Sequence, residues 1–582
     1  MNRNALIAIL VGLFALLASL PFLVPHAGFL MLSAFVPLLC AEEIAWETEM
    51  KHFWVWQYSG FVLWNAATTF WVCNATVGGG IFAVLANALQ MSLIFGLFRW
   101  SRKYIQGALP YLFLLLAWIA WERYYLTWAQ ISWPWLVLGN GFARTTGWVQ
   151  WYEYTGTLGG SLWIWGMNLA VYGIVMALGS GRWHLLNGKA RVASIAGALV
   201  LLLGPLAVSG VLLVRERHAL AGEPAGAVPA VSSASAAGAG EALSVIIAQP
   251  NFDPYHKFEA MTQAEQTAIL LQQFESALQK FPAAEPVLLI APETFTGDII
   301  VGDVPASPTY HTFKAFLSRH PNANLLFGAS TYDFIESFSR PSRTARARGE
   351  GQWYESHNSA LLMDNTGRAD IFHKSKLVVG VELTPYPAVF RPVDDWLGGV
   401  MGRCVGQSQV TNLFFREYIP GAPVSSPAGA DAGGAADAAA AAPSVREIPI
   451  GCAICYESVY GEYCTEYIRK GARLLTIITN DAWWKNTPGY RQHLSYAALR
   501  AIETRRWIAR CGNTGISAII DPTGRIVRKT AWWQPEVLTG RVALSDRQTW
   551  FVRHGDYIGR FSIFLFILLL LSVIVRALMT RR

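Results

Sequence analysis

A carboxylate, an amine and a thiol each follow a strand-like run in this chain. Glu293 ends the apolar run 287–292, Lys374 follows Ile-Phe-His at 371–373, and Cys455 follows the run 448–454. A lone buried Cys is usually an inert core residue, so the joint occurrence of the three is what indicates chemistry. Together they predict acyl transfer: the Glu takes the thiol proton, the Lys stabilises the oxyanion and the thiolate carries the acyl group.

Further motifs accompany these three residues. A second carboxylate, Glu382, follows Lys374 by eight residues. Downstream come the blocks Asn-Asp-Ala-Trp-Trp (480–484), Gln492 with His493, Arg-Ala-Ile-Glu (500–503) and Asn-Thr-Gly (513–515). In this order they resemble the apolipoprotein N-acyltransferases, a membrane branch of the nitrilase superfamily of carbon–nitrogen bond enzymes, over most of the chain. The sequence departs from the family where the usual Pro-Phe-Gly before the second Glu is Val379, Gly380 and Val381.

The resemblance implies further site residues. Those expected to support the thiol are Glu382, Tyr456 and Glu457. Those expected to contact the substrate are Trp135, Trp483 and Trp484. Trp135 belongs to a segment that resembles the family's arm from the membrane part toward the catalytic domain. Alternatives stay open for several of them: Tyr456 either lines the site or packs beside it, and tryptophans are more often core or interface anchors than substrate contacts.

Composition predicts an integral membrane protein. At 582 residues the chain is too long for one soluble domain. Hydrophobic residues make up 53% and charged residues 15%, whereas soluble proteins carry about 25% charged residues. The 24 Trp and 21 Tyr are suited to the two interfaces of a bilayer. The net charge of +7 is no sign of nucleic-acid binding, because several basic clusters lie in short loops between apolar segments.

Eight apolar segments are predicted to span the membrane. They lie at about 5–24, 28–41, 53–73, 78–97, 107–126, 161–179, 191–214 and 561–578. With eight spans, the basic residues after the fourth span, those between the sixth and seventh, and those at the chain's end all face the cytoplasm. The same topology places residues 215–560 outside, in the periplasm of an inner-membrane protein.

The remaining sequence alternates strand-like and helix-like stretches, which predicts two sheets with helices on their outer faces. This is the α/β nitrilase-like four-layer α-β-β-α sandwich that the resemblance implies. The expected domains are seven spans in 1–218, a flexible linker in 219–240, the catalytic domain in 241–545 with a disordered insertion at 420–445, and a C-terminal transmembrane helix in 546–582. One helix is expected over 492–510, with an ion-pair ladder from Arg500 to Arg510.

The pair Cys452 and Cys455 has the spacing of a redox or zinc motif. A zinc site would need a second pair of close ligands, and the next cysteine, Cys464, has no partner at that spacing. A redox pair should open a helix, whereas Cys452 lies in a strand-like run, and residues three apart on a strand point to opposite faces. We therefore expect no metal, and no organic cofactor either.

The resemblance implies an inner-membrane acyltransferase. Cys455 would take an acyl chain from a phospholipid and pass it to the N-terminal amine of a diacylated apolipoprotein, with ping-pong kinetics and no nucleic-acid partner. One alternative is a membrane-tethered nitrilase-type amidase that uses water, although a hydrolase needs one anchor rather than seven spans before its domain. The other is a transporter, for which ionisable residues in mid-span would be expected; the predicted spans carry almost none.

Overall fold

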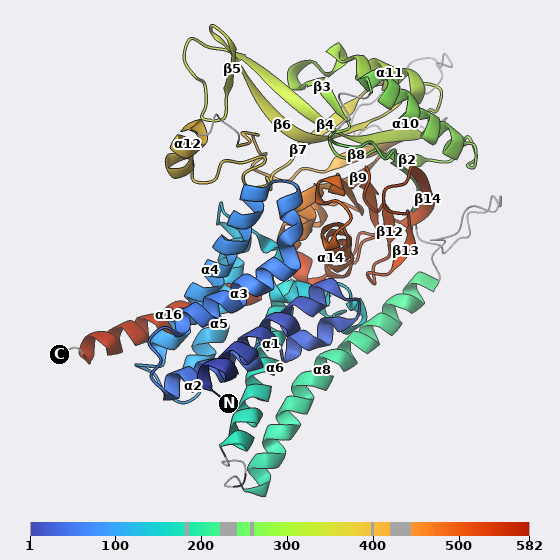
Figure 1. Ribbon diagram of the computed structural model, residues 1–582. Helices are drawn as coiled ribbons and strands as arrows, with labels where there is room; N and C mark the ends of the chain where they lie inside the picture. The colour runs from blue at the N-terminus through green and yellow to red at the C-terminus, as the bar shows by residue number, and fades with distance from the viewer. Residues whose placement is uncertain are drawn as a thin grey trace, which may run out of the picture.

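The chain folds into a bundle of long helices with a two-sheet domain at one end (Figure 1). The computed structural model describes residues 2–180, 184, 187–221, 241–255, 261–396, 401–419 and 444–580. The helices of the bundle come from the first 221 residues and from the last 30, so the two-sheet domain is inserted between the seventh and eighth predicted spans.

Helices lie over all eight segments that are predicted to span the membrane. They are α1 (Arg3–Leu23), the 3-10 helix η1 (Ala27–Leu32) with α2 (Val36–Glu47), α3 (Phe53–Thr69), α4 (Val77–Ser101), α5 (Leu109–Thr127), α6 (Tyr152–Gly179), α8 (Gly188–Ala221) and α16 (Tyr557–Met579). Within the described residues, six of these helical segments are long and apolar enough to cross a membrane, and α3 and α5 are the two that are not. The count of eight spans therefore stays a prediction.

The short second segment is a broken helix, and a side chain of a neighbouring helix forms hydrogen bonds with backbone groups at the break. Between η1 and α2, the Asn168 side chain of α6 accepts a hydrogen bond from the Phe35 N–H at 2.7 Å and donates one to the Met31 carbonyl at 2.7 Å. Non-helical backbone at membrane depth persists only where protein groups pair with it. This explains why a segment of about 14 apolar residues can still pack inside the bundle.

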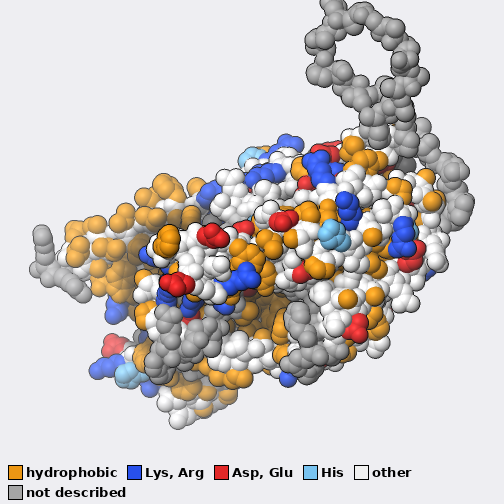
Figure 2. Space-filling model, turned by 90° about the horizontal axis from the view of Figure 1, so that it is seen from above, with side chains coloured by type: hydrophobic (Ala, Val, Ile, Leu, Met, Phe, Trp, Pro, Cys, Tyr) orange, Lys and Arg blue, Asp and Glu red, His pale blue; other side chains and the backbone are white. Residues whose placement is uncertain are grey.

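The helices α8 and α16 expose most of their apolar side chains. On α16, Phe561, Phe564 and Leu571 are each more than half exposed. In the view from above, hydrophobic side chains gather at the left, where α16 projects from the molecule (Figure 2). Apolar surface of this extent is expected of helices whose solvent is lipid.

Two sheets form the inserted domain. The first has the order β14-β1-β2-β4-β6-β5, with β3 beside β4 and β7 beside β6, and the second has the order β13-β12-β11-β10-β9-β8. The strands are β1 (Ala242–Gln249), β2 (Val287–Ile290), β3 (Thr296–Ile300), β4 (Ala323–Glu336), β5 (Arg346–Gly349), β6 (Gln352–Met363), β7 (Ala369–His373), β8 (Leu413–Ile419), β9 (Ser444–Ile454), β10 (Leu474–Thr479), β11 (Ile508–Gly512), β12 (Ala518–Ile520), β13 (Ile526–Lys529) and β14 (Glu536–Ala543).

Helices cover the outer face of each sheet, which gives the four layers that the resemblance implies. Against the first sheet lie α10 (Gln263–Leu278) and α11 (Pro308–Leu317), and against the second lie α13 (Gly461–Arg469) and α14 (Pro488–Thr504). The remaining short helices are η2 (Phe70–Asn74), η3 (Pro134–Leu136), η4 (Leu138–Phe142), η5 (Thr146–Trp148), η6 (Val301–Ala306), α12 (Pro387–Trp396), η7 (Cys455–Val459), η8 (Asp481–Trp484) and α15 (Trp550–His554). The helix α14 also packs against the bundle, so it belongs to both parts of the molecule.

Three predicted boundaries are wrong. The helix expected over 492–510 ends at Thr504, because Arg505 adopts a left-handed conformation (φ 48°) and its guanidinium donates to the Gln150 and Pro522 carbonyls. Arg510 therefore lies on β11, and the ion-pair ladder reduces to the pair Arg500 with Glu503. Residues 219–221 belong to α8 and residues 444–445 belong to β9, so they are part of neither the expected linker nor the expected insertion. Residues 222–240 and 420–443 lie outside the described residues.

Buried ion pairs attach the inserted domain to the bundle. Arg123 at the end of α5 pairs with Glu462 of α13 and with Asp556, which precedes α16. On the other side, Glu153 of α6 pairs with Arg505, which follows α14. Ion pairs without full access to water are geometrically demanding, so these two attachments restrict how the domain can lie on the bundle.

Candidate active site

The structure brings together the three residues predicted to be catalytic. Glu293 follows β2 and Lys374 follows β7, both in the first sheet, whereas Cys455 follows β9 in the second. The Lys374 Nζ lies 3.2 Å from the Glu293 Oε1, and both charged groups act electrostatically on the Cys455 thiol. The ends of strands from two facing sheets thus converge on one site.

Lys374 is enclosed by carboxylates. Its side chain is 1% exposed, and besides Glu293 its Nζ contacts the Glu382 Oε1 at 3.0 Å. Burial by itself lowers the pKa of a lysine, but Glu293 and Glu382 outweigh it and raise the pKa of Lys374 well above its usual value. The ammonium group is therefore a permanent positive charge in this site.

Asn358 is a site residue for which no role was predicted from the sequence. From β6, its Nδ2 donates to the Glu293 Oε1 and to the Glu382 Oε1, each at 2.7 Å. The second oxygen of Glu293 accepts from the Asn480 N–H at 3.1 Å. In the sequence, Asn358 stands out only as a polar residue inside a buried strand. This pattern does not reveal its hydrogen-bond partners.

The Cys455 thiol holds its proton in the resting site. Burial and the Glu293 carboxylate raise its pKa well above the usual value, and they outweigh Lys374 and the Thr479 hydroxyl, which lower it. A thiol in this state acts as a nucleophile only after a base takes its proton, and Glu293 is the carboxylate that acts most strongly on it. Cys455 begins η7 with φ 51°, a left-handed conformation that is costly for a residue with a side chain.

Glu457 fixes the position of two loops. Its Oε1 accepts from the Ser375 N–H at 2.6 Å, from the Lys376 N–H at 3.1 Å and from the Tyr463 hydroxyl at 2.6 Å. Its Oε2 accepts from the Ile454 N–H at 2.8 Å. The side chain thus joins the loop after Lys374 to the strand end before Cys455.

Tyr456 packs toward the helical part. Its hydroxyl donates to the Ser132 carbonyl at 2.8 Å, and its ring is stacked on Trp133 at 6.3 Å. The side chain is 4% exposed. Of the two alternatives for this residue, the contacts in the structure favour packing beside the site.

The three tryptophans predicted to contact substrate have different surroundings. Trp135 is 1% exposed, and its indole N–H donates to the Gln492 Oε1 at 2.7 Å. Trp484 packs on Trp71 at 4.6 Å and on Trp135 at 5.6 Å. Trp483 is 39% exposed and contacts the ring of Tyr255 edge-on at 5.1 Å. Trp135 and Trp484 therefore belong to the junction between the two parts, and Trp483 has an open face.

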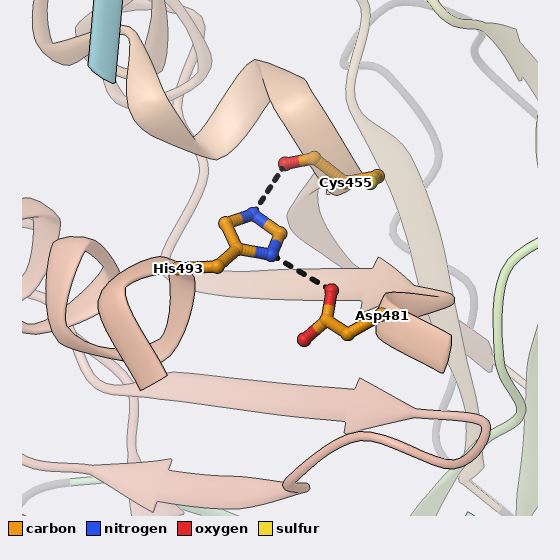
Figure 3. A group of neighbouring side chains, drawn as sticks. All are labelled: Cys455, Asp481 and His493. Atoms are coloured by element: carbon orange, nitrogen blue, oxygen red, sulfur yellow. Dashed lines mark hydrogen bonds and ion pairs between the residues drawn. The ribbon is translucent and has the colours of Figure 1, made fainter. Parts of the chain in front are cut away.

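A second buried cluster lies on the other side of Cys455 (Figure 3). The His493 Nδ1 lies 2.9 Å from the Asp481 Oδ1, and the Asp481 Oδ2 accepts from the Arg510 Nη2 at 2.6 Å. Burial by itself raises the pKa of Asp481, but Arg510 and His493 outweigh it and hold the pKa well below its usual range. No role was predicted for Asp481 or His493, and Arg510 was expected in an ion-pair ladder instead, because the sequence places the three residues in separate elements.

By distance alone, Cys455, Asp481 and His493 could hold a metal ion. Their hydrogen bonds do not fit one. Both ring nitrogens of His493 face partners, the Asp481 carboxylate and the Cys455 carbonyl, and Arg510 adds a positive charge that repels cations. Figure 3 shows the Cys455 sulfur directed away from the imidazole. The cluster is a hydrogen-bonded support.

The charges of the site act differently on Cys452. Glu293 contributes less to its raised pKa than burial and Glu457 do, and Lys374 is not among the groups that shift it. Cys452 lies within β9, is 1% exposed, and burial raises the pKa of its thiol to about 12. Its carbonyl accepts from the Tyr467 hydroxyl at 2.7 Å. All the described cysteines are free thiols.

Two family models match different parts of the chain. The model described as carbon-nitrogen hydrolase matches residues 341–551, which contain Lys374 and Cys455. The model described as apolipoprotein N-acyltransferase N-terminal domain matches residues 14–170 in the helical part. The two matches fall on the two parts of the fold.

Curated relatives match nearly the whole chain. The apolipoprotein N-acyltransferase of Chlorobaculum tepidum is 26% identical, with 94% of this chain and 95% of that protein covered. The one of Geobacter metallireducens is 26% identical over 95% and 92%, and the one of Azotobacter vinelandii is 28% identical over 86% and 82%. The helical part and the carbon–nitrogen hydrolase domain are thus matched together and in the same order. Over nearly its whole length the chain is similar to apolipoprotein N-acyltransferases.

Proposed function

We propose that the protein transfers a fatty acyl chain from a phospholipid, through a thioester on Cys455, to the N-terminal amine of S-diacylglyceryl-cysteine lipoproteins. The observation that carries the proposal is the contact of Lys374 with Glu293 beside the Cys455 thiol, in a domain joined to helices that can cross a membrane. The basic loops of the bundle support an inner-membrane location with the catalytic domain in the periplasm.

In the first half-reaction Glu293 takes the thiol proton as the Cys455 sulfur attacks the ester carbonyl of the phospholipid. Lys374 stabilises the negative charge that develops on the carbonyl oxygen, supplemented by backbone N–H groups. When the carbon–oxygen bond breaks, Glu293 returns its proton to the leaving alkoxide. The products are an acyl thioester on Cys455 and a lysophospholipid, and Glu293 is again a carboxylate.

In the second half-reaction the amine of the lipoprotein attacks the thioester carbonyl. Glu293 takes a proton from the amine, and Lys374 again stabilises the oxyanion. The carbon–sulfur bond breaks, the thiolate recovers its proton from Glu293, and an amide is released. Throughout, Asn358 and Glu382 hold Lys374 and Glu293 in place through the hydrogen bonds already described.

A carbon–nitrogen hydrolase model also matches the domain, so hydrolysis of a small amide is the second candidate. It would use the same three residues, with water in place of the amine. The exposed apolar faces of α8 and α16, and the helical bundle as a whole, favour a lipid substrate over a small amide.

Intact-mass measurement tests the proposal. Purified protein incubated with a phospholipid of defined acyl chains should gain the mass of one acyl group, on the peptide that contains Cys455. Addition of a diacylated lipopeptide with a free N-terminus should remove the adduct and acylate the peptide. A protein that forms no adduct and cleaves a small amide instead would establish the amidase.

A further inference from the structure

The Gln492 side chain connects the catalytic domain to the helical bundle. It is 1% exposed and projects from α14. Its Oε1 accepts from the indole N–H groups of Trp71 at 3.2 Å and Trp135 at 2.7 Å, and its Nε2 donates to the carbonyls of Phe22 at 3.3 Å and Thr68 at 3.1 Å. A glutamine amide has two donors and two acceptor sites, and all four are used by the helical part and its arm.

The two carbonyls belong to helix ends. Phe22 lies in the last turn of α1, which ends at Leu23, and Thr68 lies in the last turn of α3, which ends at Thr69. The last four carbonyls of a helix have no partner within it. Gln492 thus caps two helices of the bundle from outside, and its position depends on how those helices lie.

The next residue, His493, holds the backbone of the nucleophile. Its side chain is fully buried, and its Nε2 lies 3.1 Å from the Cys455 carbonyl oxygen. A carbonyl only accepts hydrogen bonds, so this contact is a hydrogen bond when Nε2 carries a hydrogen. The Ser458 hydroxyl donates to the same oxygen at 2.7 Å and also lies 3.0 Å from Nε2. These contacts fix the peptide plane that follows Cys455, where the backbone is strained. Figure 3 shows the contact from His493.

We propose that Gln492 and His493 are positioning residues that make the orientation of Cys455 depend on the seating of the catalytic domain on the helical bundle. The two residues are consecutive on one helix, so a change in the fit of Gln492 between α1 and α3 displaces His493 and the carbonyl it holds. This inference rests on the proposed function. In that function, the coupling lets the Cys455 thiol reach its working geometry only when the catalytic domain is docked on the bundle, where lipid is supplied.

Alkylation of Cys455 by iodoacetamide measures the nucleophile without any acyl substrate. We expect Gln492→Leu to lower the alkylation rate of Cys455 about tenfold, because small displacements of a reacting group cost rate steeply. For acyl transfer, kcat should fall by a similar factor while KM for the phospholipid stays unchanged. Trp71→Phe, which removes one donor to Gln492, is the milder variant in case Gln492→Leu does not fold.

Gln249→Leu is the matched control. Gln249 is fully buried, and its side chain is likewise bonded at both ends, to Ser517 and Thr530 and to the carbonyls of Ala531 and Gln534, all within the catalytic domain. It should lower the melting temperature as much as Gln492→Leu does, yet leave the alkylation rate of Cys455 within about twofold of the wild type. Equal slowing by both variants would show a general loss of stability and overturn the coupling.

His493 is tested by rescue and by a double variant. His493→Leu should slow alkylation about tenfold, and His493→Gln should recover most of the rate, because the glutamine Nε2 can donate to the Cys455 carbonyl from nearly the same place. Gln492→Leu combined with His493→Leu should be no slower than the worse single variant, since both act through one peptide plane. Additive losses, or no rescue, would overturn the proposal.

These readouts also separate the two proposals. If the wild type forms no acyl adduct with phospholipid, the proposed function fails, yet the alkylation series still tests the coupling. If the adduct forms and the alkylation rates of the Gln492 variants match the wild type at equal stability, the coupling fails and the proposed function stands.

Discussion

Two buried clusters of charge flank Cys455, and they differ in what they can do. The thiol-side cluster (Glu293, Lys374 and Glu382) sets two carboxylates against one amine, and its carboxylates are 8% and 12% exposed. The carbonyl-side cluster (Asp481, His493 and Arg510) is completely buried. A proton can be exchanged with a substrate only in the first, and the second is enclosed by protein on every side.

The difference is reflected in the pKa shifts. On the thiol side, burial and Glu293 raise the pKa of the Cys455 thiol, so its proton is retained until a substrate arrives. On the carbonyl side, Arg510 and His493 overcome burial and hold the pKa of Asp481 well below its usual range, so its charge is constant. A nucleophile must give up its proton while its backbone stays in place. It therefore needs one environment that can exchange protons and one in which the charges are constant.

The largest expected effect is the loss of the nucleophile. Cys455→Ala should abolish both the acyl adduct and all transfer, because no neighbouring group can replace the thiolate. Cys452→Ala should retain substantial activity, since that thiol is buried within β9 and Lys374 is not among the groups that act on it. Intact-mass and transfer assays on the two variants decide the assignment. A thioester on the Cys455→Ala protein would show that the nucleophile has been misassigned.

The thiol-side cluster is tested by two variants with opposite effects on the thiol. Glu293→Gln removes a negative charge that raises the pKa of Cys455, so the pH midpoint of its alkylation should fall. Lys374→Met removes the charge that lowers this pKa, so the midpoint should rise. Transfer should fall about a hundredfold or more in both, because one lacks the base and the other the oxyanion partner.

Shifts of the alkylation midpoint in the same direction would contradict these charge assignments. Lys374→Arg is the control for charge alone. It should restore the midpoint toward the wild type but not the transfer, because a planar guanidinium does not occupy the place of a compact ammonium between two carboxylates.

The carbonyl-side cluster is expected to contribute mainly to stability. Asp481→Asn leaves Arg510 buried without its counter-ion and should lower the free energy of unfolding by about 3–5 kcal/mol. Because the pKa of Asp481 is lowered in the folded state, its contribution is present above the ordinary value of about 4 and is lost as the pH falls below it.

The measurement is the melting temperature between pH 7 and pH 3. The wild type should lose more stability on acidification than Asp481→Asn does. Glu382→Gln on the thiol side is the comparison. Its main effect should be on the rate of acyl transfer, with a smaller effect on the melting temperature. Equal slopes with pH for the wild type and Asp481→Asn would mean that the carboxylate is not held ionised by its partners.

The smallest expected effect is at Trp483, and its neighbour Trp484 provides the contrast. Trp483→Ala should change the melting temperature little, because the side chain is 39% exposed, and should raise KM for the phospholipid severalfold if the open face contacts substrate. Trp484→Ala should lower the free energy of unfolding by about 3 kcal/mol or more, since it packs on Trp71 and Trp135. An unchanged KM in the first variant would leave Trp483 without the predicted role.

Strand ends could be predicted from the sequence because apolar runs mark them locally. The runs before Glu293 and Cys455 are strands β2 and β9, and Lys374 follows β7. The role of Asn358 was not predicted, and Arg510 was expected on a helix, because the contacts of both residues are with partners far along the chain, which no local pattern encodes. The boundary at Thr504 was missed for a related reason: the contacts of Arg505 with the helical part end α14 where the apolar periodicity does not.

The pairing of β1 with β14 has a consequence for the order in which the protein is made. These strands are neighbours in the first sheet, with Gln249 opposite Glu536, yet they lie at opposite ends of the inserted domain. At translation rates of about 5–20 residues per second, the first strand waits on the order of tens of seconds for the last one. During that interval one side of β1 is an unpaired strand edge, which binds other strands readily. The growing chain therefore has a window in which a chaperone that covers this edge would be of most use, and the window closes when β14 pairs with β1.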